Sequence, residues 1–239
     1  MTSSTAEPRR GGTSGRRTVL VTGASRGLGR ALVDVYAREG WSVIACVRSA
    51  PPAPTDSIVY EQLDVSDPAS IAALGRKLDG LAIDVLINNA AIRGDTGGLP
   101  SLDTEDFLAV MRVNALAPLL IARELRANLA ASGRGIIANV SSRAGSLAEG
   151  TIDDEDGDYA YRCSKAALNM ATVKLAQDLR ADGIAVISLH PGWVQTDMGG
   201  EGACVDATDS AAGLIAIIDR TDMAASGTFR AYDGRHVSW

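Results

Sequence analysis

Short apolar runs alternate with amphipathic stretches along most of this 239-residue chain. Residues 18–22 read T-V-L-V-T, and a short run of β-branched and apolar residues is typical of a strand buried on both faces of a sheet. Residues 28–39 then carry apolar side chains at helical spacing, and Gly40 is a signal for the end of a helix. The pattern therefore predicts a strand, a glycine-rich turn and a helix.

The same alternation continues to the carboxyl end of the chain. A helix is predicted to open at Asp67-Pro68, where a capping side chain precedes a proline in the first turn. Pro118 predicts a kink inside a long helix. Further strands are predicted at 41–47, 58–63, 83–87, 135–140, 184–189 and 227–232, and further helices at about 104–131, 161–180 and 209–218.

This order of elements determines the predicted fold. Most strands are continuously apolar, as in parallel sheets that helices cover on both faces. We therefore predict an α/β protein with a doubly wound, Rossmann-like parallel sheet in three α/β/α layers. No internal repeat or domain boundary is visible, so residues 17–239 are expected to form a single domain. Residues 1–16, rich in Ser, Thr, Gly and Arg, are expected to be a disordered amino-terminal tail.

Composition excludes several classes of function. The formal net charge of −6 provides no electrostatic basis for binding nucleic acid or an anionic membrane. Three cysteines, an odd number without metal-ligand spacing, predict neither a disulfide framework nor a metal site. The sequence shows no apolar run of membrane-spanning length and no signal-peptide segment. We expect a cytoplasmic protein without membrane, nucleic-acid or metal partners.

The turn at residues 23–27, G-A-S-R-G, has two interpretations. It fits the elbow that presents a hydrolase's nucleophilic serine, here Ser25. Together with Gly29 it also fits a glycine-rich turn that receives the phosphates of a dinucleotide. We favour the second, because a hydrolase elbow needs earlier strands and only the phosphate-binding turn uses Gly29, for close helix–strand packing. His236 has the right chain order for a hydrolase triad, so the elbow stays a minor alternative.

Tyr161 and Lys165 form a second candidate group. Residues four apart on a helix lie on one face, so the phenol and the ammonium project together. The positive charge would lower the pKa of the phenol from its usual value of about 10. Such a phenol could exchange a proton with an alcohol or a carbonyl near neutral pH. The alternative is an ordinary exposed helical pair.

These two groups occur with three further motifs. In order along the chain, the set is T-G-x-x-x-G-x-G at 22–29, N-N-A at 88–90, Asn114, S-S at 141–142 and Y-x-x-x-K at 161–165. With this combination the chain resembles the short-chain dehydrogenase/reductase family from residue 18 onward. Residues 161–170, residues 189–200 and the end of the chain are similar to the C-factor and Sniffer-like carbonyl reductase branch. The resemblance is specific for fold and cofactor type, and much less so for substrate.

The resemblance implies a role for four side chains. Tyr161 would be the general acid in reduction and the base in oxidation, and Lys165 would lower its pKa and hold the nicotinamide ribose. Ser142 would donate a hydrogen bond to the substrate carbonyl, on which negative charge develops. Asn114 would position a water in a proton relay behind Lys165. Asn114 could also satisfy the backbone of a kinked helix.

Charge distinguishes between the two nicotinamide cofactors. An acidic residue about twenty positions beyond the glycines would bind the ribose 2′-hydroxyl of NAD. This sequence has no acid directly after the second predicted strand and has Arg48 there, while Arg26 lies inside the glycine turn. Either guanidinium alone could be a solvated surface charge, but both together could pair with a 2′-phosphate. We therefore predict NADP(H) in preference to NAD(H).

The remaining cofactor contacts are implied by the resemblance. Asp64 and Val65 would contact the adenine, residues 88–90 would line the ribose, and Thr196 would bind the nicotinamide carboxamide. The full set of expected cofactor residues is Gly23, Ser25, Arg26, Gly27, Leu28, Gly29, Arg48, Asp64, Val65, Asn89, Ala90, Tyr161, Lys165, Pro191, Gly192, Val194 and Thr196.

Some segments depart from the family pattern. Ala91 stands where the family usually has glycine, which we expect to be a minor crowding. The acidic stretch 149–158 separates Ser142 from Tyr161 by more than is usual, and we interpret it as a solvated loop or as a partial lid that disfavours anionic substrates. The loop at about 192–210 is the expected substrate lid. Cys163 is expected to be a packing residue.

Together these features predict an NADPH-dependent oxidoreductase that reduces a ketone or aldehyde, its small-molecule substrate, with Tyr161 as the proton donor. The same residues would serve NAD(P)-linked alcohol oxidation, which is the first alternative. The second alternative is a dinucleotide-binding signalling or scaffold protein with little turnover. The apolar faces of the helices at 104–131 and 161–180 suggest a homodimer or a homotetramer.

Overall fold

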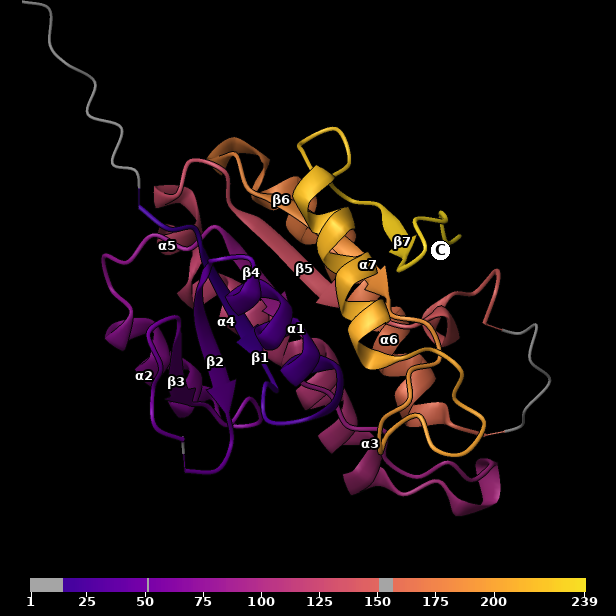
Figure 1. Cartoon of the computed structure of the whole chain (residues 1–239). Helices are drawn as coiled ribbons and strands as arrows, with labels where there is room; N and C mark the ends of the chain where they lie inside the picture. Colours follow the sequence, from indigo (N-terminus) through magenta and orange to yellow (C-terminus); the bar gives the residue numbers. More distant parts are fainter. Residues whose placement is uncertain (1–14, 51, 151–156) are drawn as a thin grey trace, which may run out of the picture.

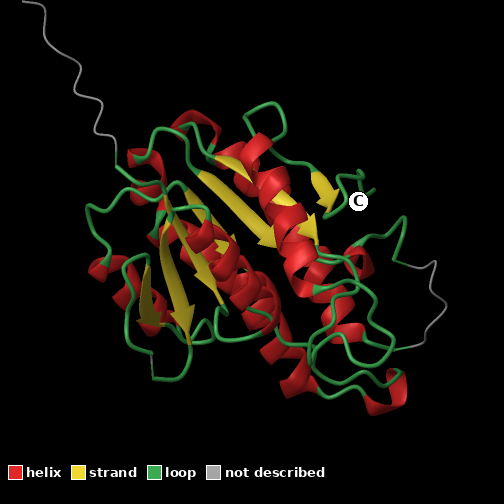
Figure 2. Cartoon of the chain, viewed as in Figure 1, coloured by secondary structure: helices red, strands yellow, loops and turns green. Residues whose placement is uncertain are grey.

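A parallel β-sheet runs through the centre of the protein (Figures 1 and 2). The structure is a computed structural model, and it describes residues 15–50, 52–150 and 157–239. Apart from its last two positions, the expected amino-terminal tail lies outside the described residues. Within the described ranges the sheet contains seven strands: β1 (Thr18–Thr22), β2 (Ser42–Val47), β3 (Ile58–Gln62), β4 (Val85–Asn88), β5 (Ile136–Val140), β6 (Ala185–His190) and β7 (Phe229–Ala231).

The chain builds this sheet outward from β1 in both directions. The strand order is β3-β2-β1-β4-β5-β6-β7. Thr18 of β1 lies opposite Ser42 of β2, and Val19 lies opposite Val85 of β4 on the other side. The direction of winding therefore reverses between β1 and β4, and in sheets of this kind ligands bind beyond the carboxyl ends of the strands at that point. The predicted doubly wound, Rossmann-like fold is confirmed.

Helices cover both faces of the sheet. On the face toward the viewer in Figure 1, α1 (Gly27–Arg38) and α7 (Ala207–Arg220) pack side by side and share a core with Val19 and Val21 of β1. Leu20 between them faces the opposite core. A central strand that contributes to two cores must be apolar throughout, which explains its sequence. The helices of the opposite face are α2 (Pro68–Lys77), α4 (Ala117–Glu124), α5 (Arg126–Ala131) and α6 (Tyr159–Asp178).

Side-chain caps define two of the helix starts. Asp67 accepts a hydrogen bond from the N–H of Ala69 (2.8 Å), and Pro68 occupies the first helical position, as predicted. Asp206 caps α7 by accepting from the N–H groups of Thr208 and Asp209. Because of this cap, α7 begins two residues before its predicted start.

The prediction of one long helix over about 104–131 is wrong. The segment consists of α3 (Thr104–Met111), a π-helical turn (Arg112–Leu116), α4 and α5. Pro118 has no N–H to donate to the carbonyl of residue 114, so an α-helical hydrogen bond is impossible there. The backbone accommodates this by widening into a π turn, a feature that is frequent at functional sites.

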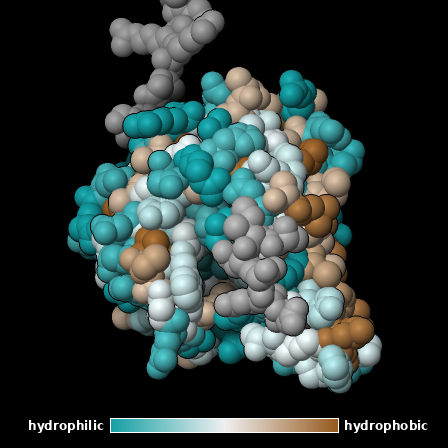
Figure 3. Space-filling view, turned by 90° about the vertical axis from the view of Figure 1, so that its right-hand side faces the viewer, coloured by the Kyte–Doolittle hydropathy of each residue, from teal (hydrophilic) through white to brown (hydrophobic). Residues whose placement is uncertain are grey.

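In the view of Figure 3 hydrophilic residues predominate, and apolar residues gather mainly along the right-hand edge and at the lower right. Among the residues that the structure describes, no helix combines the length and the apolar character needed to cross a bilayer.

Candidate active site

A large cleft opens at the carboxyl ends of the strands, where the strand order reverses. Its volume is about 1670 Å³, whereas a cleft for one drug-sized ligand is about 300–1,000 Å³. The cleft can therefore hold a dinucleotide together with a small second molecule. All seventeen residues expected to bind the cofactor line this cleft.

Hydrogen bonds hold the glycine turn after β1 against the turn after β4. Asn89 Nδ2 donates to the carbonyl oxygens of Thr22 (2.9 Å) and Gly23 (3.2 Å). A Cβ at Gly29 would collide with the carbonyl oxygen of Gly23 and would lie 2.6 Å from Asn89 Nδ2. No described side chain caps α1, so its first N–H groups remain available to an anion in the cleft. The turn has the construction of a phosphate site.

The hydrolase interpretation of this turn requires a histidine beside Ser25. Neither of the two histidines of the chain makes a hydrogen bond to Ser25 among the described residues. His190 Nδ1 accepts a hydrogen bond from the N–H of Arg143 (3.3 Å). His236 lies near the end of the chain, in a bridge with Arg230. The geometry supports a phosphate-binding turn and gives the elbow no base.

The two arginines that favour NADP(H) line the cleft in different surroundings. Arg48 is exposed at the end of β2. Hydrogen bonds from Ser66, and to a smaller extent the charge of Arg48, hold the pKa of Asp64 below its usual value. Arg26 Nη1 lies 2.5 Å from Oδ2 of Asp197, so this ion pair joins the glycine turn to the loop after β6.

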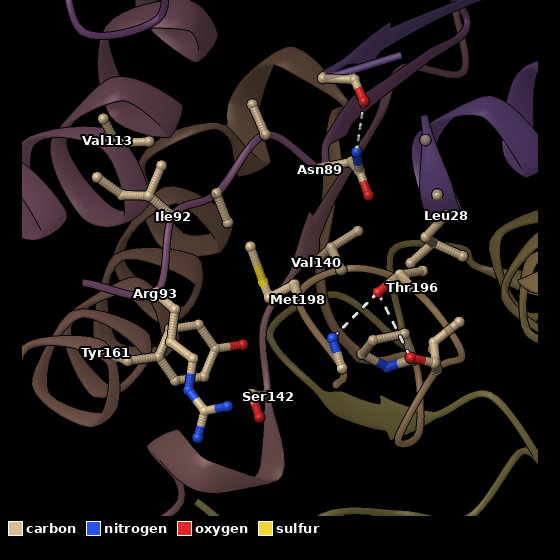
Figure 4. A pocket seen from close by; sticks show the side chains of 18 of the residues that line it. Leu28, Asn89, Ile92, Arg93, Val113, Val140, Ser142, Tyr161, Thr196 and Met198 are labelled. Atoms are coloured by element: carbon tan, nitrogen blue, oxygen red, sulfur yellow. Dashed lines mark hydrogen bonds between the residues drawn. The ribbon is translucent and has the colours of Figure 1, made fainter. Parts of the chain in front are cut away.

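Three of the four expected catalytic side chains meet on the opposite wall of the cleft. Ser142 follows β5, while Tyr161 and Lys165 lie one turn apart on α6. In Figure 4 the hydroxyl groups of Tyr161 and Ser142 lie near each other in the cleft. Lys165 Nζ donates to the carbonyl oxygen of Val140 (2.8 Å) and lies 5.5 Å from the centroid of the Tyr161 ring.

Burial controls the proton affinities of these groups. Burial raises the pKa of Tyr161 above its ordinary value, and hydrogen bonding with Ser142 lowers it in part. Burial also lowers the pKa of Lys165 to about 8. The expectation of a lowered pKa for Tyr161 is therefore wrong for this structure, because the loss of water around the phenol is the largest effect.

Asn114, the fourth expected catalytic residue, lies in the π-helical turn and does not line the cleft. Its Oδ1 accepts from the N–H of Ile92 (2.9 Å), and its Nδ2 donates to the carbonyl oxygen of Ile92 (2.8 Å). The same Nδ2 donates to Ser164 Oγ on α6 (3.0 Å). The side chain thus ties the turn after β4 to α6. Its expected role in positioning a water remains a prediction.

A buried polar network between α6 and the sheet is not among the sequence-based predictions. Asn169 Oδ1 accepts hydrogen bonds from Ser141 Oγ (2.6 Å) and Ser188 Oγ (3.1 Å). Its Nδ2 donates to the carbonyl oxygen of Gly145 (3.1 Å). Polar residues inside the otherwise apolar strands β4, β5 and β6 were the signal in the sequence that could have predicted this network. The other members are Asn88, Asn139 and Thr172.

The loop after β6, the expected substrate lid, contacts both the glycine turn and itself. A Cβ at Gly27 would lie 3.1 Å from Thr196 Cγ2, so the loop packs closely on the turn. Trp193 Nε1 donates to the carbonyl oxygen of Gly199 (2.7 Å). Figure 4 places Thr196 and Met198 at the cleft. The loop therefore lines the cleft and packs against the glycine turn.

Two further expectations can be compared with the structure. Cys163 is exposed, so its assignment as a packing residue is wrong; it lies on α6 between Tyr161 and Lys165, which face the cleft, and points away from the core. Residues 151–156 of the acidic stretch lie outside the described residues. Its two ends, Glu149 and Asp158, are described and form ion pairs with Arg235 and Arg93.

Comparisons with known proteins agree with this geometry. A family model described as short chain dehydrogenase matches residues 17–203. The C-signal of Myxococcus xanthus is 44% identical over 157 residues, which cover 66% of this chain and 93% of that protein. The NADPH-bound carbonyl reductase from chicken fatty liver has a TM-score of 0.86 and 32% identity, covering 94% of this chain and 99% of the other. The carbonyl reductase Sniffer of D. melanogaster has a TM-score of 0.87 and 29% identity, covering 94% and 100%. The predicted resemblance is confirmed.

Proposed function

The chain belongs to the short-chain dehydrogenase family, and on that basis we propose that it is an NADPH-dependent reductase of a ketone or aldehyde, with Tyr161 as the proton donor. As a member of this family the chain is an oxidoreductase. The observation that supports the finer proposal best is the meeting of Tyr161, Ser142 and Lys165 in a cleft whose other wall is the glycine turn.

The residues of the first wall fit a dinucleotide. Gly29 has no room for a Cβ beside the carbonyl oxygen of Gly23, so the turn packs closely on α1, and the N–H groups at the start of α1 are available to a phosphate. Arg48 stands where an acid would otherwise bind a ribose 2′-hydroxyl. Together with Arg26 it complements a 2′-phosphate, and the similarity to an NADPH-bound carbonyl reductase supports the same cofactor.

The chain's own residues would handle the substrate oxygen. NADPH, when bound, supplies a hydride to the carbonyl carbon. The Ser142 hydroxyl would donate a hydrogen bond to the oxygen as negative charge develops, and the Tyr161 hydroxyl would transfer its proton to that oxygen. Lys165 is protonated at neutral pH, because its lowered pKa of about 8 is still above 7, and its charge would stabilise the phenolate that remains.

Burial raises the pKa of Tyr161, so the phenol is protonated at neutral pH and carries the proton that carbonyl reduction requires. The same residue could accept a proton as phenolate, so NAD(P)-linked alcohol oxidation stays the alternative direction.

The decisive experiment is the variant Tyr161→Phe, which keeps the packing of the ring and removes only the hydroxyl. NADPH and NADH are first titrated, and NADPH oxidation is then followed with a panel of aldehydes, ketones and quinones. The variant should lose turnover by about a thousandfold or more, with NADPH binding changed by less than about threefold. Full activity in the variant would refute the proton donor, and failure of both nucleotides to bind would refute the cofactor site.

The similarity to the C-signal supports a second candidate, a dinucleotide-binding signalling protein with little turnover. The two candidates differ in their response to Tyr161→Phe. An enzyme would lose its effect in cells together with its turnover, whereas a signalling protein would keep its effect because the fold and the nucleotide site are unchanged.

A further inference from the structure

Arg93 brings a positive charge into the cleft beside Tyr161. It follows the turn after β4, and Figure 4 shows its side chain extending alongside that of Tyr161. The side chain is 42% exposed, so a molecule in the cleft can reach the guanidinium group. The charge of Arg93 is also one of the smaller influences on the pKa of Tyr161, after burial, Ser142 and Asp158.

The backbone around Arg93 is held from two sides. Immediately before it, the N–H and carbonyl groups of Ile92 both bond the side chain of Asn114. Beyond it, the carbonyl oxygen of Thr96 accepts a hydrogen bond from the N–H of Asp158 (3.3 Å). A Cβ at Gly157 would lie 2.5 Å from that same carbonyl oxygen, so the start of α6 packs directly on this loop. Arg93 therefore extends from a fixed point of the fold.

Asp158 holds the guanidinium group by one edge only. Its Oδ2 accepts from Arg93 Nη2 (3.1 Å) and its Oδ1 from Nε (3.4 Å). Nη1 has no acceptor among the described residues. A guanidinium group carries five N–H donors in a fixed plane, so the edge formed by Nη1 and Nη2 remains available. That edge matches the spacing of the two oxygens of a carboxylate.

Other described residues make the cleft rich in guanidinium groups. Arg112, Arg143 and Arg162 line the cleft together with Arg93, Arg26 and Arg48, while the carboxylates that line it are Asp64, Glu105, Asp158, Asp197 and Glu201. Arg162 Nε is buried and has no acceptor among the described residues. A buried N–H without an acceptor is unfavourable, and a ligand with acceptor oxygens would relieve it.

The described ends of the acidic stretch 149–158 do not oppose an anion. Glu149 is bound by Arg235 (2.9 Å) and by the N–H of Ser238 (2.7 Å). Asp158 is bound by Arg93. Both carboxylates therefore have their charge compensated, and the interpretation of this stretch as a lid that disfavours anions has no support from its described residues.

We infer that Arg93 is a specificity-determining residue that binds a carboxylate on the substrate, while Asp158 orients its guanidinium group. The preferred substrates are then aldehydes or ketones that carry a carboxylate. This inference rests on the proposed function for its reaction, and it adds the chemical class of the substrate. The anion would enter between Arg93 and the loop after β6, with the carbonyl group directed at Tyr161 and Ser142.

The test compares a carboxylated aldehyde, 4-formylbenzoate, with its uncharged methyl ester. Arg93→Gln should lower kcat/KM for 4-formylbenzoate about tenfold to a hundredfold, mostly through KM, and should change kcat/KM for the ester less than about threefold. Arg93→Lys should have a kcat/KM for 4-formylbenzoate between those of the wild-type protein and Arg93→Gln, since a lysine keeps the charge and lacks the planar guanidinium group. The control is Arg123→Gln on the distant helix α4, where the arginine pairs with its neighbour Glu124, and it should change neither value.

Asp158→Asn tests the same contact in the opposite direction. Asp158 has a left-handed backbone (φ 56°), which asparagine tolerates well, so the start of α6 should be kept. Asparagine keeps a side-chain oxygen that can accept one hydrogen bond from Arg93 and so orient it, while the variant removes the competing negative charge, and the preference for 4-formylbenzoate over the ester should therefore rise about threefold or more. An unchanged preference in both Arg93→Gln and Asp158→Asn would overturn the inference.

Calorimetric titration with benzoate and benzamide separates this inference from the proposed function. The wild-type protein should bind benzoate more tightly than benzamide, and Arg93→Gln should lose that difference. Equal affinity of the wild-type protein for the two ligands would overturn the inference even if both aldehydes are reduced. Absence of turnover of either aldehyde, with benzoate binding that depends on Arg93, would contradict the proposed reaction and leave the anion site standing.

Discussion

The two walls of the cleft are built in different ways. The nucleotide wall, formed by residues 23–29 and Arg48, depends on backbone conformation and on the absence of side chains at glycines. The substrate wall, formed by Ser142, Tyr161 and Lys165 with Asn169 beneath them, depends on hydrogen bonds between side chains from separate elements. Most of the nucleotide wall is therefore formed by neighbouring positions in the sequence, whereas the network of the substrate wall joins positions that only the fold brings together.

This difference has a consequence for how each wall responds to mutation. A backbone turn that packs at van der Waals distance cannot move to accept a new atom, because interiors are close-packed. A network of polar side chains can lose one member and keep its shape, at the cost of leaving the partners without hydrogen bonds. Substitutions in the nucleotide wall should therefore weaken cofactor binding. Substitutions in the network of the substrate wall should instead disturb the arrangement of α6.

The largest effect is expected for Gly29→Ala in the nucleotide wall. The new Cβ would collide with the carbonyl oxygen of Gly23 and press on Asn89 Nδ2, both of which are fixed by hydrogen bonds. We expect a loss of about 3 kcal/mol in the free energy of unfolding and NADPH binding weakened about a hundredfold, measured by urea denaturation and fluorescence titration.

The matched control for this substitution is Gly98→Ala. Gly98 has an ordinary backbone conformation (φ −82°), and its nearest obstacle to a Cβ is Pro100 Cδ at 3.7 Å. It should leave both measurements unchanged. If Gly29→Ala bound NADPH as tightly as the wild-type protein, close packing of this turn would not be what forms the cofactor site.

A smaller and different effect is expected for Asn169→Leu in the substrate wall. The substitution leaves the hydroxyls of Ser141 and Ser188 and the carbonyl of Gly145 without this partner, which should cost about 2 kcal/mol of stability. Turnover should fall with it, because the network joins α6 to the segment that carries Ser142. NADPH binding should change less than about threefold, since the nucleotide wall is untouched.

The control for Asn169→Leu is Gln177→Leu on the same helix. Gln177 is exposed and only accepts a hydrogen bond from Lys174 (2.6 Å), so its loss should change stability by less than about 0.5 kcal/mol. The comparison between the two walls would fail if Asn169→Leu weakened NADPH binding as strongly as it lowered turnover.

The same contrast explains what the sequence could predict. The alternation of strands and helices and the glycine turn follow from local patterns, because each depends on neighbouring positions, whereas most of the other cofactor residues were implied by the resemblance to the family. The π turn was missed because Pro118 acts on the carbonyl four residues before it. The pair of Arg93 and Asp158 was missed because its members are 65 positions apart and neither belongs to a motif.

The raised pKa of Tyr161 could not be predicted from the sequence either. The spacing of Tyr161 and Lys165 predicts a nearby positive charge, which is present 5.5 Å from the ring. The spacing contains no information on how completely the phenol is shielded from water, and this shielding has the largest effect on the pKa of Tyr161. Motif spacing thus predicts which groups meet, while burial decides their proton affinities.

The smallest effect expected is an acid sensitivity at His190, which lines the cleft at the end of β6. Burial, assisted by the charges of Arg143 and Arg235, lowers the pKa of His190 from 6.5 to about 4. Its Nδ1 also accepts a hydrogen bond from the N–H of Arg143, which a protonated nitrogen could not do. As the pH falls from 6.5 toward 4, the unfolded chain therefore binds a proton that the folded protein does not, and stability is lost in this window.

His190→Asn tests this effect, since asparagine can still accept the hydrogen bond and does not titrate. Because the histidine ring is partly exposed, we expect about 1 kcal/mol more stability to be lost between pH 7 and pH 5 in the wild-type protein than in the variant. Urea denaturation at the two pH values measures the difference, and the carboxylates common to both proteins cancel. Equal loss of stability in the two proteins would show that folding does not lower the pKa of His190.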